Sequence, residues 1–336
     1  MPPSGVHFNG SVNLPDAETV MCELAARVGD LAHAYPDGET GDRGNWVYFQ
    51  LPRLQAAKGI VDAGTREVAG DDFPQVRLAD HARPEHVVFS IGYADAYAAS
   101  YQTFRRLRSQ STIPAAMRFQ VQYPTPLAVV RVWFDPRDHE RVLPAYERAL
   151  FADLAALLAT IPHGDVQVQW DVAVEMGIAE RGGIGLVAPQ LARCVDQVPA
   201  DVVAGLHLCY GDYKHQHAAE PESLGTQVEL ANATRHQADR SIDFLAFTVP
   251  QYQDGDGYFA PLADLQAHPG QAYFGIVPYY PDRQAPGTTA RQVQMIDRYI
   301  AGWGVCTECG MGRVEPADVP RLLDLHRAIV AEHSAS

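Results

Sequence analysis

Short runs of apolar and β-branched residues recur along this chain, and amphipathic stretches separate them. Runs of this length and composition, bounded by turn residues, are typical of strands buried in a sheet. The pattern therefore predicts strands at Val6–Leu14, Val87–Gly92, Arg118–Tyr123, Val166–Asp171, Val202–Cys209, Asp243–Val249, Ala272–Pro278 and Trp303–Thr307.

The stretches between these runs repeat apolar residues every three or four positions, which is the pattern of one buried helix face. The first face follows Asp16, a suitable helix cap, and the second ends before Pro162 and Gly164. The third stops at Gly302, and the last begins behind Asp318. The four predicted faces are Val20, Leu24, Val28 and Leu31; Leu143, Tyr146, Leu150, Leu154 and Leu157; Val293, Ile296 and Ile300; and Leu322, Leu325, Ile329 and Val330.

Strands that alternate with helices in this way predict an α/β fold, and eight of them predict a (β/α)8 barrel, or TIM barrel, over residues 1–336. The alternative is an open, doubly wound sheet, which would need a Gly-rich first turn. The candidate for that turn, Arg181–Gly185, lies in mid-chain and does not fit. Residues 36–86, rich in Gly, Asp and Pro, are too long for an ordinary connection. We expect them to form a long loop insertion between strands 1 and 2 that covers the top of the barrel.

Composition narrows the class of protein. The 336 residues are 47% hydrophobic, which suffices for a large core, and the net charge of −15 argues against a nucleic-acid partner. No apolar stretch approaches the roughly 20 residues that span a membrane, and Met1–Gly5 lacks the features of a signal peptide. Five scattered cysteines do not form a disulfide framework. We expect a cytoplasmic protein of unknown oligomeric state without a membrane or nucleic-acid partner.

The segment Gly205–Tyr210 contains His207 and Cys209, and Cys309 follows about a hundred positions later. In a strand, residues two apart point to the same face, so His207 and Cys209 can contact one ion. An imidazole and two thiolates suit Zn²⁺, and three protein ligands leave one coordination position open for chemistry. The alternative is a buried histidine and two buried free cysteines.

Architecture favours the metal interpretation. The active site of a TIM barrel lies at the C-terminal ends of its strands, which is where Asp171, His207, Cys209 and Cys309 fall, with Ser11 near the end of the first strand. Cys306 and Cys309 also form a C-x-x-C pair, but a structural zinc site would need a second pair of ligands. We therefore interpret Cys309 as a ligand, and the remaining cysteines as structural: Cys22, Cys194 and Cys306.

These segments resemble the catalytic barrel of cobalamin-independent methionine synthase, in the superfamily that also holds uroporphyrinogen decarboxylase. The resemblance runs in order over nearly the whole chain and matches the short, single-barrel members in size. The matching segments are Gly10-Ser11, Gly41–Phe49, Gln169–Asp171, Gly205–Tyr210 and Glu308–Arg313.

The resemblance implies a zinc-dependent methyltransferase that transfers a methyl group from a methyltetrahydrofolate to a small thiol. His207, Cys209 and Cys309 would hold the zinc, Asp171 would bind the substrate amino group, and Ser11 would contact its other end. Metal binding would deprotonate the thiol, whose ordinary pKa of about 8.5 keeps it protonated at neutral pH.

The chain departs from the family pattern in two places. Thr248 stands where methionine synthases supply a further glutamate ligand, which leaves three protein ligands, as in related coenzyme-M methyltransferases and alkyltransferases. A second substrate-binding carboxylate is also missing near Val47-Tyr48. Glu39, Glu175 or Glu308 could replace it, and we expect Glu308 and Asp171 to take part in catalysis.

The charged run Asp37–Arg43 belongs to the long insertion. We expect it to fold over the barrel and to place Glu39 or Arg43 within reach of the substrate, because a reactive methyl donor benefits from a cover that excludes water. The alternative is a surface loop with an internal salt bridge.

Other functions remain open for the same pocket. They are zinc-assisted C–S bond cleavage, a metal-independent decarboxylation like that of the porphyrinogen enzyme, and a structural zinc site without catalysis.

Overall fold

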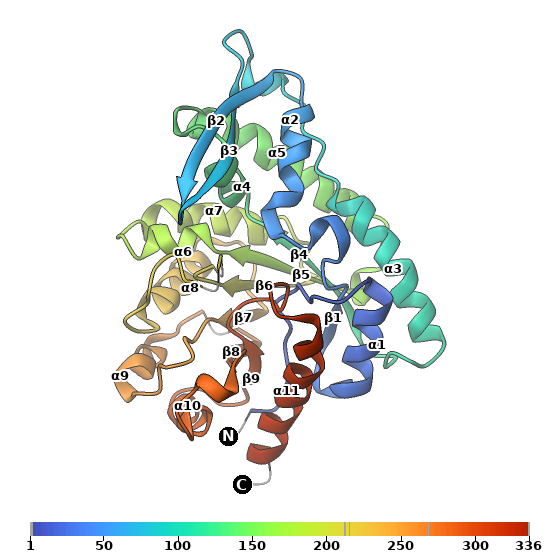
Figure 1. Ribbon diagram of the computed structural model, residues 1–336, viewed down its shortest axis with the longest axis vertical. Coiled ribbons are helices and arrows are strands. Elements are labelled where there is room, and N and C mark those ends of the chain that lie inside the picture. The colour runs from blue at the N-terminus through green and yellow to red at the C-terminus, as the bar shows by residue number, and fades with distance from the viewer. Residues whose placement is uncertain (1–2, 212, 215, 268, 335–336) are drawn as a thin grey trace.

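The computed structural model describes residues 3–211, 213–214, 216–267 and 269–334 (Figure 1). At its centre lies a curled, seven-stranded sheet whose neighbouring strands all run parallel. In spatial order the strands are β1 (Ala34–Pro36), β4 (Arg118–Pro124), β5 (Val166–Val172), β6 (Val203–Leu208), β7 (Phe244–Phe247), β8 (Gln271–Val277) and β9 (Gly304–Thr307). Six of them coincide with predicted strands to within two residues at either end.

The sheet is not a closed eight-stranded barrel, so that part of the prediction is wrong. The expected first strand, Val6–Leu14, makes only isolated parallel bridges: Val6 pairs with Ala32 before β1 and with Val305 of β9. Gly10, with a φ of 112°, interrupts the extended backbone that a regular strand would need. The segment nevertheless lies between the two edge strands, and the curled sheet is compatible with a TIM-barrel-like fold.

Eleven helices occur in the described part of the chain, and many of them pack around the sheet. Along its outside, α11 contacts α1, α1 contacts α3, and α7 contacts α8. The Asp16 carboxylate caps α1 by accepting the Thr19 amide at 2.8 Å, as predicted. The helices are α1 (Ala17–Arg27), α2 (Leu51–Ala56), α3 (Tyr93–Ser109), α4 (Pro126–Trp133), α5 (His139–Leu158), α6 (Val174–Ala179), α7 (Ile184–Asp196), α8 (Gly225–Gln237), α9 (Asp256–Phe259), α10 (Thr288–Asp297) and α11 (Val319–Ser334).

The insertion at residues 36–86 has more structure than the sequence indicated. It contains α2 and an antiparallel hairpin of β2 (Ile60–Val68) and β3 (Asp71–Leu78), which stands above the sheet in Figure 1. The predicted strand Val87–Gly92 is wrong: these residues are irregular, and Val88 is 82% exposed. The strand that lies next to β4 in the sheet is instead the three-residue β1.

A group of side chains packs together in the interior of the curled sheet, and we call it the barrel floor: His7, Phe244, Tyr273 and Cys306. All four are buried, and the His7 ring stacks on Tyr273 with centroids 4.8 Å apart. The His7 Nε2 atom lies 2.7 Å from the side-chain oxygen of Gln169. Cys306 therefore packs in the interior, as its sequence position predicted.

No helix in the described part of the chain is long and apolar enough to cross a membrane.

Candidate metal centre

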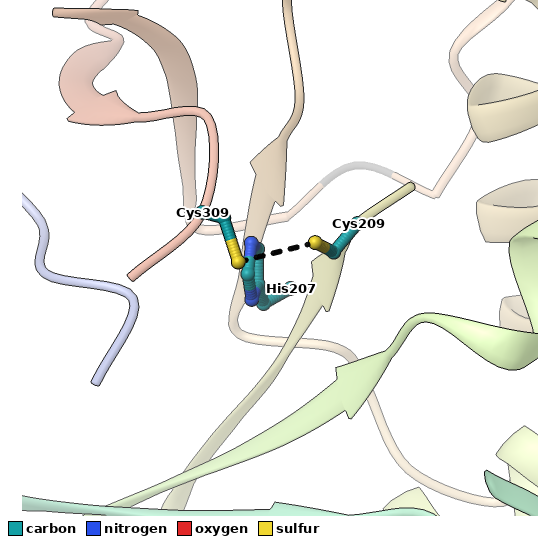
Figure 2. Close-up of side chains that lie close together, drawn as sticks. All are labelled: His207, Cys209 and Cys309. Carbon is teal, nitrogen blue, oxygen red and sulfur yellow. Dashed lines mark hydrogen bonds between the residues drawn. The ribbon is translucent and has the colours of Figure 1, made fainter. Parts of the chain in front are cut away.

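Three potential ligands meet at the C-terminal end of the sheet (Figure 2). His207 is the penultimate residue of β6, Cys209 follows β6 directly, and Cys309 lies two residues beyond β9. Their ligand atoms all lie within 4.8 Å of one another, and the two sulfur atoms are 3.4 Å apart. The structure thus brings together the three side chains that the sequence pattern singled out, close enough for one ion to contact them all.

Strand geometry and local hydrogen bonds explain this convergence. His207 and Cys209 are two residues apart in an extended segment, so their side chains leave it on the same side. Cys309 is fixed through its backbone: the Tyr279 hydroxyl accepts its N–H at 2.8 Å and donates to its carbonyl at 2.7 Å. The Thr307 hydroxyl donates to the same carbonyl at 2.6 Å. Cys309 therefore does not depend on a metal to hold its place.

The imidazole of His207 is oriented by a carboxylate from the neighbouring strand. Asp171 of β5 stands in register with His207, and its Oδ1 atom lies 3.2 Å from His207 Nδ1. Burial lowers the pKa of His207, but the hydrogen bond to Asp171 and the charge of Cys309 outweigh it, so the pKa is raised overall. A proton held at Nδ1 by Asp171 leaves Nε2 as the atom that can bind a metal, an arrangement typical of zinc-binding histidines.

Thr248 does not supply a fourth ligand. Its hydroxyl donates to the carbonyl of Glu308 at 2.8 Å, and the cluster of potential ligands found among the described residues consists of His207, Cys209 and Cys309 alone. A metal held by these three side chains would keep one position open, as catalytic zinc sites do.

A cavity of about 270 Å³ opens above this cluster, and His207, Cys209 and Cys309 all line it. Ser11 and Asp171, which were predicted to bind substrate, line it too. Four aromatic side chains from the 36–86 insertion and from the chain after β6 form part of its other walls: Trp46, Tyr48, Phe73 and Tyr213.

The insertion covers this cavity through its hairpin and not through its charged run. Val68 and Ala69, at the turn between β2 and β3, line the cavity. Lys214, in the chain after β6, holds the hairpin by an ion pair with Asp71 at 2.8 Å and by a hydrogen bond to the Ala69 carbonyl at 3.0 Å. Two elements distant in sequence are thus joined above the site.

The two residues proposed from the charged run lie outside the cavity lining. Glu39 is buried behind Ser11, whose hydroxyl donates to it, and burial together with the nearby Asp171 raises the pKa of Glu39 to about 8. Arg43 is buried in an ion pair with Asp37, and its guanidinium lies 4.6 Å from the centre of the Tyr97 ring. Glu39 therefore reaches the cavity only through Ser11, while Arg43 anchors the insertion from behind.

Glu308 and Glu175 are not among the residues that line the cavity, and each is hydrogen-bonded to another side chain. A carboxylate oxygen of Glu308 lies 2.9 Å from Nε2 of His217, and the other nitrogen of that imidazole lies 3.2 Å from Glu220. Burial opposes protonation of His217, but these carboxylates, Glu308 above all, raise its pKa to about 9. Glu175 is fully buried, accepts the Thr125 hydroxyl, and has a pKa raised to about 7 by burial.

His217 lines the cavity but was missed from the sequence. The available signal was its position in the loop after β6, which is where a TIM-barrel-like fold places functional residues. Its distance in sequence from Cys209 and Glu308 matches no known motif, so only the structure shows that it contacts Glu308.

No family model matches the chain, and no curated protein matches it in sequence. The similarity lies in the fold. A B12-independent methionine synthase from Shewanella sp. W3-18-1, in complex with selenomethionine, superimposes with a TM-score of 0.61 over 100% of this chain and 98% of its own, at 14% identity. A putative vitamin-B12-independent methionine synthase from Listeria monocytogenes gives a TM-score of 0.59 over 98% of both chains, at 11% identity. The chain therefore shares its overall fold with methionine synthase-type proteins.

Proposed function

We propose that this chain is a zinc-dependent enzyme that transfers a methyl or other alkyl group to a small thiol. The observation that carries the proposal is the convergence of His207, Cys209 and Cys309 at the base of a cavity. The fold neighbours, which are methionine synthase-like proteins, agree with it at the level of reaction type.

The donor set fits zinc better than a hard cation. One imidazole and two sulfur atoms are ligands that zinc binds well and that Mg²⁺ or Ca²⁺ avoid. Asp171 holds Nδ1 of His207, which leaves Nε2, now 3.3 Å from the Glu308 carbonyl, as the nitrogen that would bind a metal. When bound, the metal would lower the pKa of a thiol in its open position, so that the sulfur is a nucleophile at neutral pH.

The chain's own residues would bind and orient the substrates. Asp171 and Ser11 line the cavity beside the ligands and offer a carboxylate and a hydroxyl to the polar end of the thiol substrate. Glu39 holds the Ser11 hydroxyl in place from behind. The aromatic side chains around the opening would exclude water from the reacting sulfur, which favours attack on the alkyl carbon over competing hydrolysis. A methyltetrahydrofolate is the donor that the family resemblance implies.

The proposal predicts about one zinc per chain in protein purified without chelators. Zinc-loaded protein should then convert a small thiol to its methyl thioether in the presence of a methyl donor, which mass spectrometry with a deuterated methyl group detects. Stoichiometric zinc without alkylation of any thiol by any donor would instead indicate a structural zinc site.

Activity assays distinguish the remaining alternative functions. A C–S lyase would release a thiol from a thioether without a methyl donor, and a decarboxylase of the porphyrinogen type would keep its activity after zinc removal. Full activity of chelated protein would therefore contradict the proposed function.

A further inference from the structure

One side of the cavity is built from aromatic rings that meet at steep angles. We call Tyr48, Phe73 and Tyr213 the aromatic wall, because all three line the cavity. The Tyr48 and Phe73 rings lie 5.7 Å apart at 63°, and Phe73 and Tyr213 lie 5.2 Å apart at 76°. Edge-to-face contact is a preferred packing of aromatic side chains, and it leaves the three rings of the wall turned in different directions along the cavity.

Trp46 extends this wall on the other side of Val47. It lines the cavity, has a positive φ of 42°, and its buried indole N–H has no partner among the described residues. A bulky side chain in the left-handed region carries backbone strain, which is commonly retained where a side chain must be held in a binding position.

Carboxylates stand close to the wall on two sides. The Tyr213 hydroxyl donates to Asp71, and Asp171 lines the cavity near the potential ligands. Lys214 pairs with Asp71, and its Nζ atom also lies 5.6 Å from the centre of the Tyr213 ring, so one cation already stands at this ring. Arg313 lines the cavity near the phenol oxygens of Tyr48 and Tyr213. The ring faces themselves are the negative part of an aromatic quadrupole, so they attract a cation that has shed its water.

Three groups of the described lining that could give a proton are already engaged in hydrogen bonds. Both nitrogens of His217 face carboxylates, Ser11 donates to Glu39, and Tyr213 donates to Asp71. Burial, with Tyr213 beside it, raises the pKa of Tyr48 to about 12, which makes its phenol a weak acid. A methyl group that leaves a neutral amine nitrogen, as it does in a methyltetrahydrofolate, needs such a proton on its leaving group.

We propose that the methyl donor of this cavity is a small methylated onium cation, a sulfonium or a quaternary ammonium, held against the aromatic wall. This inference rests on the proposed thiol alkylation and replaces the donor that the family resemblance implies. The thiolate sulfur forms a bond to the methyl carbon while the bond from that carbon to the positive sulfur or nitrogen breaks. The bonding electron pair stays with the leaving atom, so a neutral sulfide or tertiary amine departs without protonation. The proton of the thiol is lost to solvent before the transfer.

Binding can be tested on the whole protein without added metal. Calorimetry should show that choline binds about tenfold more tightly than 3,3-dimethyl-1-butanol, its neutral isostere, because the cation–π attraction is absent from the neutral molecule. Tyr213→Leu should remove most of this difference and leave the affinity for the alcohol within about twofold. Tyr213→Phe, the matched control, keeps the ring and should keep the preference for the cation. Equal affinity for the two molecules, or a preference that survives Tyr213→Leu in a folded variant, would overturn the proposal.

The transfer step has a separate test. Zinc-loaded protein should methylate 2-mercaptoethanol from deuterated trimethylsulfonium, with the label recovered in the thioether, at least tenfold faster than from methyltetrahydrofolate. If only the folate serves as donor, the onium proposal is overturned and thiol alkylation stands. If neither the onium, the folate nor methyl iodide alkylates the thiol, the proposed function itself fails. Tyr48→Leu provides a second wall variant should Tyr213→Leu not fold, with its folding checked by circular dichroism.

Discussion

The barrel floor contains one histidine and one cysteine, the candidate metal centre contains one histidine and two cysteines, and the two groups differ in chemistry. In the barrel floor, His7 and Cys306 are sealed among aromatic rings, so burial lowers the pKa of His7 to about 3 and raises that of Cys306. At the metal centre, His207 is equally buried, yet its pKa is raised because Asp171 and Cys309 stand beside it. Burial alone makes these residues inert, whereas a charged partner and an adjoining cavity make them reactive.

The sharpest test of this comparison exchanges one sulfur in each group. Cys209→Ser should lose nearly all bound zinc and all thiol alkylation, because an alcohol is a far poorer zinc ligand than a thiolate. Cys306→Ser should keep both, while its buried hydroxyl lowers the free energy of unfolding by about 1–3 kcal/mol. Metal analysis and denaturant unfolding of the two variants measure these effects. Full zinc occupancy in Cys209→Ser would remove the basis of the metal centre.

The next largest effect concerns the carboxylate that distinguishes His207 from His7. Asp171→Asn should weaken zinc binding about 10- to 100-fold, since the amide is a poorer partner for His207 Nδ1–H than the carboxylate. Competition with a zinc-sensitive dye would measure this change. Glu175→Gln, a buried carboxylate outside the cavity lining, is the matched control and should leave zinc affinity unchanged. Equal losses in the two variants would indicate a general loss of packing.

The barrel floor should change how the free energy of unfolding depends on pH. His7 is neutral in the folded protein down to about pH 3, whereas in the unfolded chain it binds a proton near pH 6.5. The unfolded state therefore gains the extra proton, and this site lowers the free energy of unfolding by up to about 1.4 kcal/mol per pH unit as the pH falls from 6.5 towards 3. Urea unfolding of His7→Gln across this window should show a correspondingly smaller slope. An unchanged slope would mean that His7 is not held neutral.

The smallest effect is expected for the ion pair that holds the β2–β3 hairpin over the metal centre. Lys214 and Asp71 are both partly exposed, so Lys214→Ala should lower the free energy of unfolding by at most about 1 kcal/mol. It should raise the KM for the methyl donor less than fivefold and leave zinc affinity unaltered, because the ion pair holds the hairpin and not the ligands. Steady-state kinetics with zinc titration measures both quantities. A larger loss of zinc would show that the cover and the ligands are coupled.

The central strands could be predicted from the sequence because their apolar runs are continuous and buried. β5 and β6, for example, follow their predicted ranges closely, and their register brings Asp171 beside His207. The candidate ligand set followed from the same logic, since the penultimate residue of β6, the residue directly after it and a residue after β9 all lie at the C-terminal end of the sheet. The identity of the metal, the thiol and the donor stays a prediction.

The predictions that failed have physical causes. The β-branched run at Val87-Val88 is exposed, and apolar composition alone does not show whether a run pairs with neighbours. β1 has three residues and ends at Pro36, which is too short for any periodicity. The β2–β3 hairpin is rich in glycine and aspartate, so its strands resemble a loop in composition. The sequence did not show that Arg43 lies outside the cavity lining. The structure pairs its guanidinium with Asp37, so the charge is not directed at the cavity.

The sealed barrel floor has a kinetic consequence. Phe244, Tyr273 and Cys306 are buried and pack together, so side chains fill this part of the sheet interior. In the proposed reaction, substrates and products would then share the cavity mouth beneath the hairpin. A thiol that binds at the base of the cavity would have to enter before the donor, and its thioether would leave after the spent donor. The architecture thus predicts an ordered, sequential mechanism with the thiol as the leading substrate.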